Sequence, residues 1–167
     1  MFAKDLETLL AKDAIRQVLV NYCRGMDRMD DALSRATWHP GGRAFYEGIF
    51  DGTGDEFCAW VIEFHRGLLS TSHEVSNVNI VVDGDRASSE AYVEVNLLGL
   101  ENGKHVLRTG HGRYLDSWSK RNGRWAVDHR HYVSDFGYSR EVEGRLGPAK
   151  RSPEDASYRV LQGLAPA

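Results

Sequence analysis

The chain has 167 residues, a length that favours one domain. Lys and Arg number 21 against 24 Asp and Glu, a net charge of -3 that supports neither a nucleic-acid surface nor a polybasic membrane patch. No apolar run approaches the roughly 18 residues of a spanning helix, and residues 1–12 do not resemble a signal peptide. Two cysteines exclude a disulfide framework, so we expect a reducing, cytoplasmic location.

Apolar residues recur every three or four positions in the first part of the chain, which predicts helices. Glycine, proline and cap-forming residues mark where these helices begin and end. In chain order, the expected elements are a helix over 5–26, a short helix over 30–37, a turn at Trp38-His39-Pro40-Gly41-Gly42, a short strand over 44–50, a loop over 51–55 and a helix over 55–69.

From His73 onward the apolar period changes to two, which is typical of half-buried strands. Hairpin turns are predicted at 83–85, at 101–104 and, most strongly, at Asn122-Gly123. Helices followed by hairpins predict an α+β fold, in which the helices cross one side of a curved antiparallel sheet and leave a pocket at its open end. We expect a domain over 1–137, and a tail over 138–167 with a short helix at 153–161.

Tyr22 and Asp27, near the end of the first helix, are the first candidates for chemistry. They lie about 140° apart on an ideal helix, so both reach one cavity only if the last turn frays or bends. A carboxylate at a helix C-terminus is unfavourable for the helix dipole, which makes Asp27 an unusual structural choice. The alternative is a core tyrosine followed by a polar helix end.

His73 lies between the predicted helix at 55–69 and the first long strand. Histidine titrates near neutral pH and suits the work of a general base. A neighbouring aspartate would fix its tautomer and stabilise the imidazolium ion. The alternative is a half-buried histidine that bonds to the backbone.

The stretch Asp128-His129-Arg130-His131 contains His-x-His, a spacing found among metal ligands on strands. Regular pairing across the Asn122-Gly123 turn would place Asp116 opposite His129, and His111 on the other face from both histidines. The register therefore predicts no three-histidine metal site, unless a β-bulge shifts it.

Arg130 is the more useful candidate on this strand. A buried arginine flanked by His111 could hold an anionic leaving group or an oxyanion. The alternative is a structural salt bridge, for example to Asp27.

Seven short motifs follow one another in a characteristic order. They are Ile15 … Tyr22-Cys23-Arg24-Gly25-Met26-Asp27, His39-Pro40, His73-Glu74-Val75-Ser76-Asn77, Val82-Asp83-Gly84-Asp85-Arg86-Ala87, Gly112-Arg113-Tyr114, Gly123-Arg124-Trp125 and His129-Arg130. In this order and spacing, over about residues 5–136, the chain resembles the SnoaL-like branch of the nuclear-transport-factor-2-like superfamily.

The resemblance implies a cone-shaped α+β barrel, also called cystatin-like. Within the superfamily the chain is similar to scytalone dehydratase, bile-acid 7α-dehydratase and hexachlorocyclohexane dehydrochlorinase. These enzymes use no cofactor and remove a proton with a His–Asp pair. The resemblance also implies a homo-oligomer, with a trimer favoured over a dimer.

The resemblance assigns a role to each candidate. His73 matches the general base, Asp27 the residue that orients and charges it, Tyr22 a hydrogen-bond donor, and Arg130 a group that stabilises negative charge. The residues expected to contact a small-molecule substrate are Trp38, Tyr46, Trp60, Asn77 and His111.

The expected function is that of a cofactor-independent lyase without a metal. It would eliminate water, formaldehyde or another small leaving group from a small hydrophobic, aromatic substrate. Two other classes stay open. An isomerase or cyclase of the same fold would use the same base, and a non-catalytic binding protein or subunit would use the same pocket without chemistry.

Overall fold

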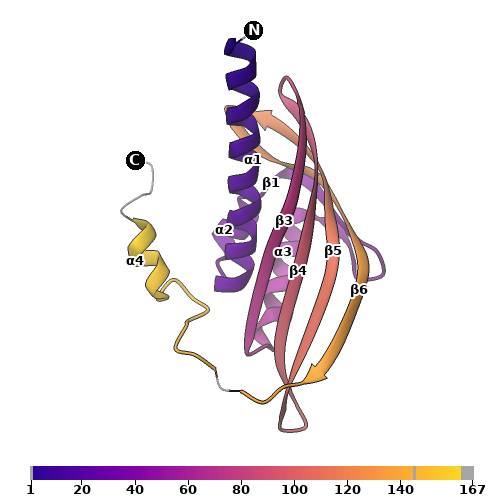
Figure 1. Cartoon of the computed structure of the whole chain (residues 1–167), viewed down its shortest axis with the longest axis vertical. Helices are drawn as coiled ribbons and strands as arrows, with labels where there is room; N and C mark the ends of the chain where they lie inside the picture. Colours follow the sequence, from indigo (N-terminus) through magenta and orange to yellow (C-terminus); the bar gives the residue numbers. More distant parts are fainter. Residues whose placement is uncertain (1, 145, 163–167) are drawn as a thin grey trace.

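The computed structural model describes residues 2–144 and 146–162. A long N-terminal helix and a second helix over residues 54–66 lie on one side of a strongly curved sheet (Figure 1). Within these residues no helix is long and apolar enough to cross a membrane. The elements are α1 (Phe2–Arg28), α2 (Asp31–Arg35), β1 (Trp38–Tyr46), β2 (Phe50–Thr53), α3 (Gly54–Arg66), β3 (Ser70–Asp83), β4 (Arg86–Glu101), β5 (Lys104–Arg121), β6 (Arg124–Glu141) and α4 (Ala156–Gln162).

The six strands form one sheet in the order β2-β1-β6-β5-β4-β3. The hairpins β3–β4, β4–β5 and β5–β6 are antiparallel, whereas β1 pairs with β6 in parallel. The expected α+β fold is therefore confirmed, with one correction: the sheet is mixed. Between β1 and the antiparallel strands β3 to β6, the chain passes through β2 and α3. The last of these strands, β6, then lies beside β1 and runs in the same direction.

The expected turn at Trp38-His39-Pro40-Gly41-Gly42 is wrong, because these residues form the first half of β1. Trp38 pairs with Val127, and regular pairing with β6 resumes only at Arg43, so the strand holds an irregularity between them. Gly41 has a φ of 77°, a backbone conformation that glycine adopts at little cost. The proline and glycines thus bend a strand instead of ending it.

The loop expected over 51–55 is mostly strand β2, and α3 begins directly after it. The Thr53 hydroxyl accepts a hydrogen bond from the Glu56 N–H at 3.2 Å, and the Glu56 carboxylate accepts one from the Thr53 N–H at 2.8 Å. This capping box fixes where the helix starts.

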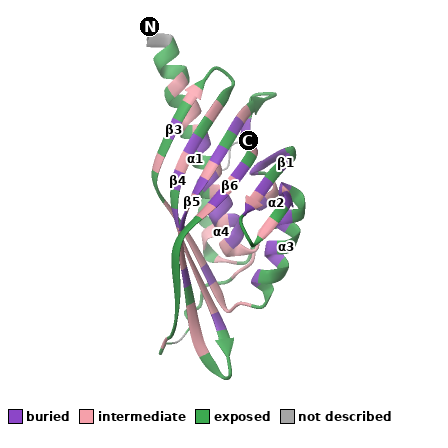
Figure 2. Ribbon diagram, turned by 90° about the vertical axis from the view of Figure 1, so that its right-hand side faces the viewer, coloured by how far each residue is buried: buried purple, intermediate pink, exposed green. Residues whose placement is uncertain are grey.

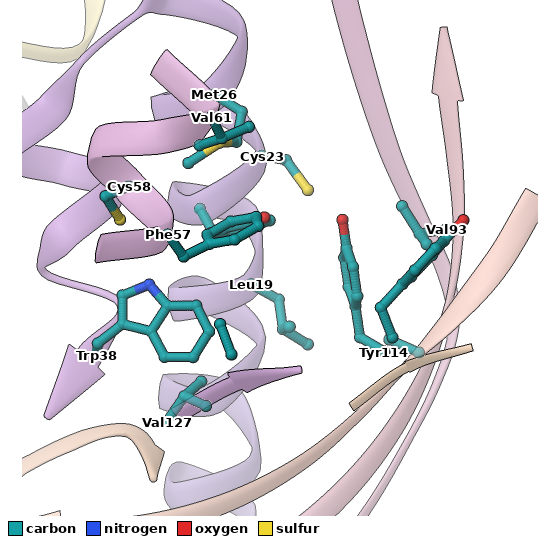
Figure 3. Packing of buried hydrophobic residues seen from close by; sticks show 14 of the residues in the cluster. Leu19, Cys23, Met26, Trp38, Phe57, Cys58, Val61, Val93, Tyr114 and Val127 are labelled. Carbon is teal, nitrogen blue, oxygen red and sulfur yellow. The ribbon is translucent and has the colours of Figure 1, made fainter. Parts of the chain in front are cut away.

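The core lies between the helices and the concave face of the sheet. Buried residues gather where the strands face the helices, and the hairpin ends are exposed (Figure 2). Leu19 and Met26 of α1 and Val61 of α3 pack towards Val93 and Tyr114 of the sheet (Figure 3). The apolar faces that the helical period and the two-residue period predict for helices and strands therefore pack together in one core.

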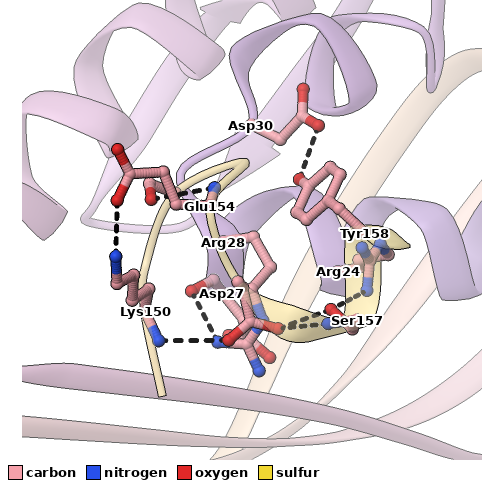
Figure 4. A network of polar contacts seen from close by, with 10 residues as sticks. Arg24, Asp27, Arg28, Asp30, Lys150, Glu154, Ser157 and Tyr158 are labelled. Carbon is pink, nitrogen blue, oxygen red and sulfur yellow. Dashed lines mark hydrogen bonds and ion pairs between the residues drawn. The ribbon is translucent and has the colours of Figure 1, made fainter. Parts of the chain in front are cut away.

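The chain after β6 returns to α1 and packs beside its C-terminal end (Figures 1 and 4). The Tyr158 hydroxyl donates to Asp30 at 2.7 Å, and Arg24 donates to the Ser157 hydroxyl at 3.0 Å. The expected helix at 153–161 is present as α4, three residues later at its start. Residues 145 and 163–167 of the expected tail lie outside the described residues.

Candidate active site

Asp27 and His73 meet where the end of α1 lies against the start of β3. Asp27 Oδ1 lies 2.7 Å from His73 Nδ1, and Asp27 Oδ2 accepts a hydrogen bond from the His73 backbone N–H at 3.0 Å. Both side chains are largely buried, with 15% and 6% of their surfaces exposed. One carboxylate therefore holds both the ring and the backbone of this histidine.

The pairing determines which ring nitrogen of His73 is free to react. An ionised carboxylate only accepts hydrogen bonds, so Nδ1 carries the proton that faces Asp27. The lone pair is then on Nε2, the remaining nitrogen of a ring that lines a cavity. A histidine held in this way can take a proton from a bound molecule, and the aspartate stabilises the cation that forms.

The sequence indicated that Tyr22 and Asp27 could both reach one cavity only if the last turn of α1 frayed or bent. The helix does not fray there, since it continues to Arg28. Tyr22 lines the cavity, whereas Asp27 lies beside it and acts on His73 from there. The two side chains need not point the same way, since only one of them faces the cavity directly.

The cavity has a volume of about 420 Å³ and lies between the helices and the concave face of the sheet. One part of its wall is polar, with Tyr22, Tyr46, His65 and His73. The rest is mostly aromatic and aliphatic, with contributions from Phe57, Trp60, Val61, Phe64, Val95 and Leu97. A few polar groups in an apolar cavity are typical of a site for a small organic molecule.

A larger cleft of about 620 Å³ lies near the turn between β3 and β4 and the adjoining end of β5. Its walls are formed by mixed charged and polar residues such as Asp85, Lys120 and Asp128. It contains no histidine, and the His73–Asp27 pair lies elsewhere. We therefore place the candidate site in the smaller, more apolar cavity.

Two buried tyrosines form a pair of hydroxyl groups in the cavity wall. The hydroxyl oxygens of Tyr22 and Tyr46 lie 3.1 Å apart. Burial raises the pKa of Tyr22 well above its usual value and that of Tyr46 to about 12. Both hydroxyls therefore keep their protons at neutral pH, and the one that donates to a bound molecule accepts the hydrogen bond of the other.

Arg130 lies behind this wall and does not line the cavity. It is fully buried and donates two hydrogen bonds to Asp116, from Nε at 2.8 Å and from Nη2 at 2.7 Å. Its guanidinium carbon lies 4.4 Å from the ring centre of Tyr22 and 3.9 Å from that of Tyr114. Contrary to the expectation of direct contact with a leaving group, Arg130 does not face the cavity and instead contacts the rings of Tyr22 and Tyr114.

The partner of Arg130 also corrects the predicted register. Asp116 lies opposite Arg130 and not opposite His129, because the pairing of β5 with β6 shifts between Ser117 and Trp118. Asp128 is the residue that has no partner at this bulge. The salt bridge that we considered with Asp27 is therefore made with Asp116. In the described ranges, no cluster of three or more His, Cys, Asp or Glu could hold a metal ion.

Of the five expected substrate contacts, Tyr46 and Trp60 line the cavity, whereas the other three lie elsewhere. Trp38 is buried against Phe57 and does not line the cavity. Asn77 is exposed, with a φ of 47°, where the pairing of β3 with β4 shifts. His111 stacks on Phe136 at 4.3 Å and pairs with Glu94, away from the cavity.

The sequence reasoning missed His65, a second histidine in the cavity wall. It is only 2% exposed, and its ring centre lies 5.6 Å from that of His73. Burial, together with the nearby His73 and Arg151, lowers the pKa of His65 to about 4, so the ring is neutral at pH 7. Its position four residues after Val61 and eight after Phe57, on the apolar face of α3, is the signal that could have found it.

The chain matches the SnoaL-like domain family over residues 7–131. No curated protein sequence matches it. Among solved structures, a type 2 hexachlorocyclohexane dehydrochlorinase (LinA) superposes with a TM-score of 0.75 at 18% identity, over 86% of this chain and 98% of that chain.

Two proteins of Novosphingobium aromaticivorans share the same architecture. A candidate scytalone dehydratase superposes with a TM-score of 0.69 at 19% identity, over 87% of this chain and 94% of that chain. An NTF2-like protein with a cystatin-like fold superposes with a TM-score of 0.67 at 20% identity, over 80% and 88%. At these identities the structures establish the fold, and the domain match establishes the family. The chain therefore belongs to the SnoaL-like family and has the NTF2-like fold.

Proposed function

We propose that this protein is a lyase that removes a proton from a small, largely aromatic substrate and eliminates a small leaving group without a cofactor. The observation that carries the proposal is the contact of 2.7 Å between Asp27 Oδ1 and His73 Nδ1 beside a largely apolar cavity. A binding protein would need the cavity but not this histidine–carboxylate pair.

In the proposed reaction, His73 Nε2 takes the proton from a C–H bond of the substrate. The electron pair of that bond forms a double bond to the neighbouring carbon, and the leaving group departs from that carbon with its own pair. A departing hydroxide then receives the proton from the imidazolium and leaves as water. General base catalysis of this kind contributes roughly 10²- to 10⁴-fold to the rate.

Tyr22 is the donor that we assign to the leaving group or to a substrate carbonyl. Its hydroxyl lies at the cavity wall, and its partner Tyr46 can accept from it or donate to it. Because both hydroxyls are held in place before a substrate arrives, they cost little reorganisation during the reaction. Arg130 supports this pair from behind, since its positive charge opposes the effect of burial on the pKa of both tyrosines.

The size and walls of the cavity favour an aromatic substrate. A volume of about 420 Å³ fits one or two rings with short substituents. Trp60 and Phe64 stack on one another with a ring-centre distance of 5.9 Å and offer a flat aromatic surface. Two of the solved structures that share this fold are named for elimination reactions, a dehydrochlorinase and a candidate dehydratase, which is consistent with the proposal.

The test is incubation of the purified protein with aromatic alcohols, halides and lignin-type diaryl compounds without any cofactor. A new conjugated chromophore, together with water or halide in the mass balance, would support the proposed elimination. A product of unchanged mass would instead identify an isomerase or cyclase. If several compounds bind but none is turned over, the protein is not an enzyme that acts on these classes of compound.

A further inference from the structure

Arg108 is a charged residue of the cavity wall that the proposed reaction does not use. Across the sheet, His73, Val95 and Gly110 form one row of paired residues, and Thr71, Leu97 and Arg108 form the next. Directly paired residues point to the same face, so Arg108 shares the concave face with Leu97. Two strand spacings and two residues separate it from His73, which places the Cα atoms roughly 12 Å apart.

The charge of Arg108 is not matched inside the cavity. No Asp or Glu of the described chain lines the cavity with it. Its Nη2 pairs with Glu101 at the β4–β5 hairpin, and both side chains are about half exposed. Exposed ion pairs of this kind contribute little energy and exchange partners readily. Among the described residues, no hydrogen bond reaches its Nε or Nη1, so the guanidinium retains donors for a ligand.

The surroundings of Arg108 leave space for a ligand group. Arg108 lines the cavity, and the neighbouring Gly99 has no side chain to occupy the space beside it; a Cβ there would meet Arg108 Nη1 at an ordinary contact distance of 3.8 Å. Between Arg108 and the polar end of the cavity the wall is apolar, with Val95 and Leu97 on the sheet. The cavity thus has a reactive polar end, an apolar middle and a single fixed positive charge.

We propose that the substrate is an aromatic acid whose carboxylate binds Arg108 while its ring lies along the apolar middle and its reacting carbon faces His73. This inference rests on the proposed function for the identity of the site, and it adds the chemical class of the substrate. A guanidinium binds a carboxylate through two parallel hydrogen bonds, which sets orientation as well as affinity. Asp27 does not oppose the anion directly, because its carboxylate is held by His73 and does not line the cavity.

The test is a fluorescence titration with 3-phenylpropionate and its uncharged analogue 3-phenylpropanamide. Trp60 lines the cavity, so binding should change its emission, and the variant Trp60→Phe should lose that change. We expect the carboxylate to bind roughly three- to tenfold more tightly than the amide at low ionic strength. The preference should shrink as salt is added, because a half-exposed charge is screened.

Three variants locate the charge that causes the preference. Arg108→Gln should abolish the preference for the carboxylate, and Glu101→Gln should increase it by removing a competing anion. Lys104→Gln, which removes an exposed charge of the same hairpin outside the cavity, should leave it unchanged. Circular dichroism checks that each variant is folded. Equal affinities of the wild type for both probes, or a preference that persists in folded Arg108→Gln, would overturn the proposal.

The two proposals fail in different ways. The probes carry no leaving group, so their binding does not depend on the proposed elimination. A preference that follows Arg108 without turnover of any aromatic acid would reject the lyase and leave the anion site supported. Turnover of neutral aromatics with no preference for the carboxylate probe would reject the anion site alone.

Discussion

Asp27 holds His73 through both of its carboxylate oxygens, one on the ring and one on the backbone N–H. The two contacts fix the position of the residue and the tautomer of its ring at the same time. The first contact gives the histidine its chemistry, and the second joins the end of α1 to the first residues of β3. Loss of the carboxylate charge should therefore affect activity more than folding.

Asp27→Asn should lower kcat by roughly 10²- to 10⁴-fold, because the amide can donate to Nδ1 and so favours the wrong tautomer. The measurement is turnover of a substrate identified with the panel described above, together with the melting temperature. The control is Asp51→Asn, which removes an exposed carboxylate that pairs with Arg43. Turnover within a few-fold of the wild type would contradict the role of Asp27.

Tyr22→Phe should lower kcat by about 10²-fold, with little change in KM, if the hydroxyl acts mainly in the transition state. The ring stays, so its packing under Arg130 is kept. Steady-state kinetics separates the two parameters. A rise in KM at constant kcat would show that the hydroxyl only binds the substrate.

Asp116→Asn should lower the free energy of unfolding by about 3–5 kcal/mol, because it leaves the fully buried Arg130 without its anion. The double variant Arg130→Met with Asp116→Leu should recover most of that loss, since it buries no charge. Urea unfolding followed by fluorescence gives both values. The exposed pair Arg43–Asp51 serves as the control, and its removal should cost less than about 1 kcal/mol.

Acidification should destabilise the protein through His65. The pKa of His65 is about 4 in the folded chain, below the ordinary value near 6.5 that applies when the chain is unfolded. The unfolded state therefore binds more protons between these values, and stability falls as the pH drops from about 6.5 to 4, by up to about 3 kcal/mol. Urea unfolding at several pH values should show a flatter profile for His65→Gln, and an identical profile would contradict this origin.

Two glycines on β5 should respond differently to alanine. A Cβ at Gly112 would lie 2.4 Å from the Val133 carbonyl oxygen, which is backbone and cannot move aside. At Gly110 the nearest atom would be the Tyr132 hydroxyl, 3.8 Å away. Gly112→Ala should therefore cost about 1–3 kcal/mol of stability, whereas Gly110→Ala should cost less than about 1 kcal/mol. Similar losses at both positions would contradict this steric account.

The order of helices and hairpins could be read from the sequence, because the change of period from helical to alternating near His73 is a local signal. The first strand could not. Trp38 to Gly42 carries the residues of a turn, and it becomes a strand only by pairing with β6, which lies more than eighty residues later in the chain. Its pairing is a tertiary effect that no local pattern contains.

The candidate site was predictable to a different degree at each residue. Asp27 and His73 are 46 positions apart, so only the resemblance to a family brought them together. Asp116 was predicted opposite His129 instead of Arg130, because one extra residue, Asp128, shifts the register of the last hairpin. Nothing in the residue types around the Asn122-Gly123 turn marks that bulge, and a shift of one residue changes which side chains face each other.

The packing of the last segment against α1 has a consequence for how the protein is made. Arg151 donates to the backbone carbonyls of His65 and Leu68, at 3.0 and 2.7 Å, and so closes the end of the helix that carries one wall of the cavity. Ser157 accepts a hydrogen bond from Arg24 of α1, and Tyr158 donates one to Asp30, which caps α2. These residues follow all six strands in the chain, so they are synthesised after the sheet. The contacts that close the helix ends beside the cavity can therefore form only after all six strands have been made.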